Sequence, residues 1–141
     1  MRRWIDKARE VAKEYRSNCA ELRRMQDAMG EIKTSLEGTP VKGGKISKPV
    51  EAAVEQEMMQ ERLRYLEQAV GAVEYALECV AAKPQGDITK RLFNMVYSDR
   101  SHTLYGAATV LHIAEPTAKR YNRYLLKMIA KAMGFLKVDT F

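Results

Sequence analysis

A long apolar repeat at the start of the chain constrains its fold more than any other feature. Between residues 4 and 36, apolar side chains return at alternating steps of four and three residues, with one polar exception. This 3.5-residue spacing is typical of the contact face of a coiled coil, and here it continues for more than four heptads. The repeat therefore predicts a long helix that packs against another helix. Its positions are Trp4, Ala8, Val11, Tyr15, Asn18, Leu22, Met25, Met29, Ile32 and Leu36.

The same repeat returns after a break in the chain. Residues 37–49 contain three glycines and two prolines, a density that a continuous helix does not tolerate. Ser47 can cap the helix that follows, with Pro49 in its first turn. Two such faces joined by a short connection predict an antiparallel helical hairpin over residues 1–83, and further apolar residues beside the second face favour self-association. The second face consists of Met59, Leu63, Leu66, Val70, Val73, Leu77 and Val80.

Asn18 interrupts the first apolar face, and two interpretations of it are open. A polar residue at such a position can fix the register or the number of associated helices, at some cost in stability. Alternatively, its side chain is partly solvated and specifies nothing.

The stretch Lys83-Pro-Gln-Gly86 separates this hairpin from a second predicted domain, because proline and glycine end a helix. Asp87 is a good cap for a third helix, and residues 87–137 contain enough amphipathic segments for three helices. No segment shows a convincing β-strand pattern. The predicted fold class is therefore all-α: a long N-terminal helical hairpin that resembles a coiled coil, then a C-terminal three-helix domain with a helix-turn-helix.

Residues 103–124 carry the helix-turn-helix prediction. Ala108 and Ala118 are small where the two helices of such a motif cross closely. His112 lies at the turn position that requires a left-handed backbone, which histidine tolerates better than most residues. Ala114 stands where a serine or threonine cap is usual, so the second helix is expected to begin without a side-chain cap.

The distribution of charge favours a polyanionic partner for this last helix. The chain has a net charge of +6; residues 50–86 are acidic, with 3 Lys and Arg against 7 Asp and Glu, whereas residues 87–141 hold 9 against 4. A basic cluster on one helix is the usual footprint of nucleic-acid binding, although a solvated helix face can have the same composition. The predicted DNA-contacting residues are Thr117, Lys119, Arg120, Arg123, Lys127 and Lys131.

These six residues are expected to divide into two roles. The four nearest the start of the helix are expected to meet the major groove. Arg120 or Arg123 is the better candidate for bidentate contact with guanine, because only a planar fork reads both acceptors. Lys127 and Lys131 lie further along the helix and are expected to touch phosphate.

The sequence favours neither an enzyme nor a metal or cofactor site. Gly44-Lys45 is followed by isoleucine rather than serine or threonine, and a predicted helix precedes it, so the segment is a hinge and not a phosphate-binding loop. His102 and His112 lack Cys or carboxylate neighbours at ligand spacing. The absence of a long apolar run predicts no membrane span. The two cysteines match no redox spacing, and together these features indicate a cytoplasmic location.

Several segments resemble the RinA-type phage transcriptional activators, which are related to the ArpU-type phage regulators. The C-terminal part of that family is similar to the helix-turn-helix of sigma factor region four. The resemblance covers nearly the full length, although only residues 91–134 are specific. The segments that carry it are Gly43-Gly-Lys-Ile-Ser-Lys-Pro49, Met95-Val-Tyr97, Thr103-Leu-Tyr-Gly-Ala-Ala108, Thr117-Ala-Lys-Arg-Tyr121 and Ile129-Ala-Lys-Ala-Met-Gly134.

The resemblance implies a sequence-specific DNA-binding activator of phage or prophage late genes, acting in the cytoplasm of a bacterial host. Double-stranded DNA and further copies of the same chain are the expected partners, and host RNA polymerase is an additional candidate. Two alternatives stay open: a small terminase-like subunit that recognises a DNA-packaging site, and a helical adaptor that binds only protein.

Overall fold

The computed structural model describes residues 3–38 and 49–136, and their side chains at 3–30 and 53–136. Within these residues every regular element is helical, so the predicted all-α class is confirmed. The elements are α1 (Trp4–Gly38), α2 (Pro49–Ala81), α3 (Gly86–Phe93), the π-helical turn η1 (Asn94–Ser98), α4 (Leu104–Val110) and α5 (Glu115–Met133). Of the predicted break at 37–49, residues 39–48 lie outside the described residues, as do the proposed cap Ser47 and Lys137.

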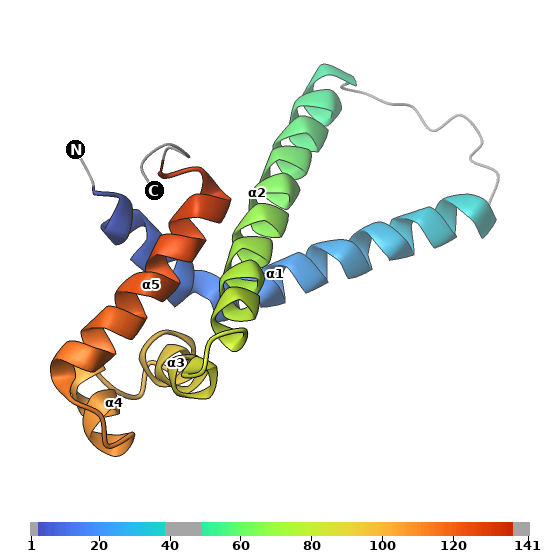
Figure 1. Ribbon diagram of the computed structural model, residues 1–141. Helices are drawn as coiled ribbons and strands as arrows, with labels where there is room; N and C mark the ends of the chain where they lie inside the picture. Colours follow the sequence, from blue (N-terminus) through green and yellow to red (C-terminus); the bar gives the residue numbers. More distant parts are fainter. Residues whose placement is uncertain (1–2, 39–48, 137–141) are drawn as a thin grey trace.

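The two long helices pack together over only part of their length. Figure 1 shows α1 and α2 crossing at the first half of α1 and then diverging toward the ends that flank residues 39–48. Near the crossing, Ala8 of α1 and Val73 of α2 are completely buried. Further out, Met29 on α1 and Met59 on α2 are 45% and 48% exposed, although both belong to the predicted apolar faces. On this side an ion pair of Arg62 with Glu21, at 2.7 Å, still joins them, and we call the diverging parts beyond it, residues 22–38 of α1 and 49–61 of α2, the arms.

α5 packs against both long helices, on the side of their crossing that is away from the arms (Figure 1). Leu125, Leu126, Ile129 and Ala130 of α5 are at most 1% exposed, and they share one core with residues of α1, α2 and η1. The main core thus combines residues from both sides of the 82–85 turn, where the sequence predicts a boundary between two domains.

Aromatic residues of α3 and η1 close one end of this core. Phe93 is 1% exposed and lies edge-on to Tyr15 of α1, with ring centroids 5.6 Å apart. The Tyr97 hydroxyl donates a hydrogen bond to the Asn122 side-chain oxygen in the interior. Burial raises the pKa of Tyr97, so this phenol is neutral when it donates.

A close approach of backbones joins α2 to α3. Gly86 is the first residue of α3, and a Cβ atom there would overlap the carbonyl oxygen of Val80 and lie 2.9 Å from the Cα of Ala81. That carbonyl already accepts a hydrogen bond from the backbone N–H of Lys83, at 3.0 Å. Only glycine therefore fits where the chain turns from α2 into α3.

A second, smaller core lies between α3, α4 and the start of α5. Its buried members are Leu92, Ala107, Ala108 and Ala118. Ala107 and Ala118 are completely buried and Ala108 is 2% exposed. Ala108 and Ala118, which were expected to allow a close helix crossing, therefore lie in one cluster.

The ends of α4 and α5 follow the local expectations from the sequence. The Thr103 hydroxyl caps α4 by accepting a hydrogen bond from the Gly106 N–H at 3.0 Å. His112, in the turn before α5, has a positive φ of 57°, which confirms the predicted left-handed position. Ala114 is the N-cap of α5 and offers no side-chain bond, which is also as predicted. Gly134 ends α5 in a left-handed conformation.

Candidate nucleic-acid interface

The outer face of α5 carries a basic stripe of exposed and half-buried cations. Arg120, Lys127 and Lys131 are separated by seven and four residues, which places them on one side of a helix. Arg120 and Lys131 are exposed and Lys127 is half-buried, whereas the opposite side of α5 lies in the core. Of the residues of α5, only Glu115 is acidic. The stripe therefore presents positive charge along most of the helix.

The first two turns of α5 project beyond α1 and α2, beside α4 (Figure 1). Thr117 is half-buried there, and Lys119 is exposed with its ammonium 3.4 Å from the Glu115 carboxylate. The Arg120 guanidinium lies 5.9 Å from the ring centroid of Tyr121. An exposed ion pair of this kind contributes little and is easily exchanged, so Lys119 can be redirected to an external anion.

Arg123 lies in a different environment from Arg120. Its guanidinium stacks over the indole of Trp4, 5.5 Å from the ring, at the beginning of α1. Lys7, one turn further along α1, lies 5.7 Å from the ring of Phe135. The beginning of α1 thus adds aromatic and cationic groups to one flank of the basic stripe. The apolar repeat placed Trp4 on a helix–helix face and did not predict this contact.

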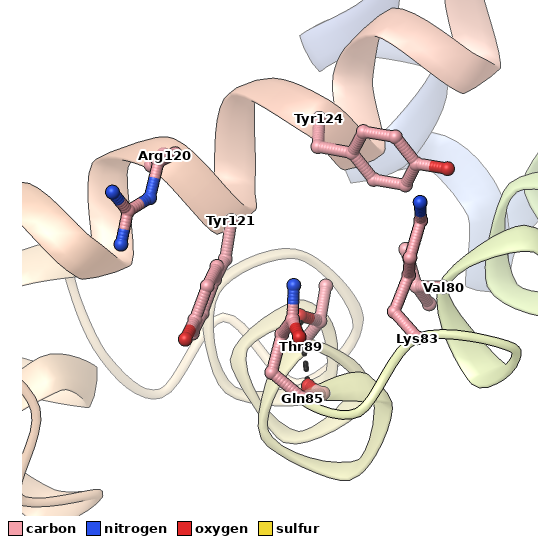
Figure 2. A pocket seen from close by; sticks show the side chains of 7 residues that line it. All are labelled: Val80, Lys83, Gln85, Thr89, Arg120, Tyr121 and Tyr124. Atoms are coloured by element: carbon pink, nitrogen blue, oxygen red, sulfur yellow. Dashed lines mark hydrogen bonds between the residues drawn. The ribbon is translucent and has the colours of Figure 1, made fainter.

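The other flank of the stripe contains a pocket of about 180 Å³, where α2, the 82–85 turn, α3 and α5 meet. Figure 2 shows that Lys83 and Gln85 reach from the turn toward α5, while Arg120 lies at the far side of Tyr121. The Lys83 ammonium lies 5.4 Å from the ring of Tyr124. The lining residues are Val80, Lys83, Gln85, Thr89, Arg120, Tyr121 and Tyr124, and none of these described residues is acidic.

Sequence reasoning did not place Lys83 or Gln85 in a functional site. Both belong to the stretch that ends α2, and nothing in their local spacing indicates a partner. They lie in the tight turn between α2 and α3, where Gly86 allows the two helices to approach closely. The six predicted contact residues, in contrast, all lie on α5, and the structure distributes them between its projecting start and its flanked second half.

The described residues contain no group of three His, Cys, Asp or Glu side chains that could hold a metal ion. His102 shares a hydrogen bond of 2.8 Å with the neighbouring Ser101 hydroxyl, and His112 serves the turn before α5. In the same part of the chain, no helix combines the length and apolarity needed to cross a membrane.

Comparisons of the chain with protein-family models, with curated proteins and with solved structures gave no match.

Proposed function

We propose that this protein binds double-stranded DNA through α4, the turn after it and α5, arranged as a helix-turn-helix. One observation carries the proposal: Ala107, Ala108 and Ala118 let α4 cross α5 closely while the opposite face of α5 stays exposed and basic. In proteins of this kind the second helix lies in the major groove and its first turns contact base edges. The projecting start of α5 is the part of this helix that can enter a groove.

The proposed contacts divide according to how α5 is flanked. Thr117, Lys119 and Arg120 lie on the projecting turns and are assigned to the major groove, with Arg120 as the guanine-reading residue. Arg123 is held over Trp4 at the edge of the exposed turns, which favours Arg120 over Arg123 for that role. Since a helix rises about 1.5 Å per residue, Lys127 lies about 10 Å beyond Arg120, where a phosphate contact is the natural assignment. Lys131 follows one turn later and is assigned the same role.

We propose further that two or more copies associate through the arms. Met29, Val54, Met58 and Met59 are between 45% and 64% exposed there, which is a costly arrangement for large apolar side chains in a lone molecule. The repeat of 3.5 residues continues into the arm of α1, and the arm of α2 adds the apolar side chains of Val54, Met58 and Met59, so another helix can cover these surfaces. Joining two reading helices raises their combined affinity without any new DNA contact.

The proposed biological role is activation of phage or prophage late genes in a bacterial cell, with host RNA polymerase as a candidate partner. This step depends on the resemblance to the RinA-type activators, since DNA binding alone fits packaging as well as regulation. Promoter-selective binding by a dimer or tetramer supports activation. A large closed ring in light scattering supports a terminase-like packaging subunit instead.

The DNA assignment is tested with Arg120→Ala and Lys127→Ala, measured on a selected binding site and on random duplex at matched salt. We expect Arg120→Ala to cost about 1–3 kcal/mol on the selected site and to reduce specificity. Lys127→Ala should weaken both duplexes to a similar extent. Lys13→Ala is the matched control, because Lys13 is exposed on the face of α1 that points away from the core. Equal losses on both duplexes for the two α5 variants would contradict the assignment. No retardation of either duplex by the unmodified protein at low salt would leave a protein-binding adaptor.

A further inference from the structure

The pocket beside α5 has the properties of an anion site rather than of an apolar ligand site. It is bordered by two cations, Lys83 and Arg120, and by the neutral donor Gln85. Its aromatic members, Tyr121 and Tyr124, form the wall that belongs to α5. A negatively charged group in this space would face the Lys83 ammonium and the Gln85 side chain, with Arg120 beyond the Tyr121 ring and no carboxylate among the lining residues.

Contacts within the protein already direct Lys83 toward this space. Its ammonium is held 5.4 Å from the Tyr124 ring, so part of the entropic cost of ordering a long side chain is met before any ligand arrives. The Gln85 backbone carbonyl accepts hydrogen bonds from the N–H and from the hydroxyl of Thr89, which ties the turn to α3. Figure 2 shows the side-chain amide of Gln85 directed toward α5. Two donors thus converge from the turn on the flank of the helix.

We infer that Lys83 and Gln85 hold a backbone phosphate of DNA at the edge of the groove that α5 enters. The inference rests on the proposed function and extends the interface beyond α4 and α5. The sugar-phosphate strands run along both sides of a helix in the major groove, so a pocket on its flank lies where a strand passes. Arg120 borders the same pocket on the side of the reading helix, which puts the phosphate contact next to the base contact.

The proposed contact gives the 82–85 turn a positioning role. A phosphate contact carries no sequence information by itself, but it sets how deeply and at what angle the reading helix enters the groove. Lys83 and Gln85 therefore fix the register in which Arg120 meets a base. Lysine acts here as a point charge on the phosphate, and glutamine adds a neutral hydrogen bond.

The test measures the dependence of DNA affinity on salt for Lys83→Ala, Lys83→Arg and the control Lys13→Ala. When a protein neutralises one phosphate fewer, the plot of log affinity against log salt becomes less steep by about 0.9. We expect this change in slope and a roughly tenfold loss of affinity for Lys83→Ala. Lys83→Arg, which keeps the charge, should retain the slope, and Lys13→Ala should match the unmodified protein. A slope for Lys83→Ala equal to that of the control overturns the inference.

A second measurement locates the phosphate and separates the two proposals. Duplexes are made in which one phosphate at a time is replaced by an uncharged methylphosphonate. At one position the replacement should lower the affinity of the unmodified protein for the duplex but should not lower the affinity of Lys83→Ala any further. If every position affects both proteins equally while specific binding persists, the Lys83 contact is wrong and the DNA-binding function stands. If the unmodified protein shows no salt-dependent binding to any duplex, the proposed function itself fails.

Discussion

Replacing Gly86 by alanine should destabilise the protein, whereas the same change at Gly71 should stabilise it. Both glycines belong to helices, and alanine at either position restricts the unfolded chain to a similar extent. A Cβ atom at Gly71 would meet nothing within 4 Å. At Gly86 it would overlap the Val80 carbonyl oxygen and approach the Ala81 Cα to 2.9 Å. Both substitutions therefore lower the entropy of the unfolded chain, but only Gly86→Ala adds a steric clash to the folded protein.

The size of the difference follows from these contacts. Alanine in a helix interior is worth about 0.5–1 kcal/mol relative to glycine, which is the gain expected for Gly71→Ala. Forcing an extra methyl group into a packed site costs about 1–3 kcal/mol. The upper part of this range applies to Gly86, because the opposing atoms are backbone and cannot rotate away. After subtracting the shared entropic gain, Gly86→Ala should destabilise the protein by about 1–2 kcal/mol.

Thermal and urea unfolding, followed by far-UV circular dichroism, measure both variants. For a chain of this length, 1 kcal/mol shifts Tm by about 3 °C, so Gly71→Ala should raise Tm by about 2–3 °C and Gly86→Ala should lower it by about 3–6 °C. Gly86→Ala should also weaken DNA binding, because the added methyl group displaces the backbone and moves Lys83 and Gln85 relative to α5. Changes of the same sign and size in both variants would refute the close approach of α2 and α3.

Two further substitutions test the local contacts that position α4 and α5. Thr103→Ala removes the cap of α4 and should cost about 1 kcal/mol in unfolding experiments, whereas Thr109→Ala, which removes only a bond to the Tyr105 carbonyl within the same helix, should have little effect. Tyr97→Phe leaves the Asn122 oxygen buried without its donor and should cost about 1–3 kcal/mol, with exposed Tyr105→Phe as the control. Because burial raises the pKa of Tyr97, its contribution is complete below the ordinary tyrosine pKa of about 10 and declines above it. The stability gap between the unmodified protein and Tyr97→Phe should therefore narrow at alkaline pH, and a constant gap would contradict this account.

Local features of the fold could be predicted from the sequence because they depend on a few neighbouring residues. His112 has the backbone that its place in the turn requires, and Ala114 begins α5 without a side-chain cap. The small side chains Ala108 and Ala118 lie in one cluster, as their spacing indicated. Each of these outcomes follows from backbone preference or side-chain size at one position.

The partners of each helix face could not be predicted in the same way. Periodicity shows which side of a helix is buried but not what covers it, and the apolar face of α1 packs against α5 and η1 as well as α2. The core of α5 includes Leu126 and Ala130 as well as Leu125 and Ile129, because a helix packed against two others is buried over a wider arc than one that covers a single neighbour. Lys83 and Gln85 also reach their site through tertiary packing alone.

The periodicity of α1 left two interpretations of Asn18 open, and the burial of its side chain decides between them. Its side chain is only 4% exposed, and its Nδ2 atom has no hydrogen-bond partner among the described residues. The interpretation of a partly solvated residue is therefore wrong. A buried donor without a partner lowers the stability of the folded protein. Asn18 therefore does not strengthen the packing of α1, and the other interpretation, that it restricts how α1 can pack, is retained.

The packing of α5 against both α1 and α2 has a consequence for how the chain folds during its synthesis. Roughly 50 residues separate the end of α2 from the end of α5. At about 5–20 residues per second, the ribosome needs some 3–10 seconds to produce them. Throughout that interval Ala8, Val11 and Val73 have no α5 to cover them, so the nascent chain exposes the surface that later becomes its main core. Contacts between the first and last helices also close the longest loops in the molecule, and the formation of such contacts slows folding.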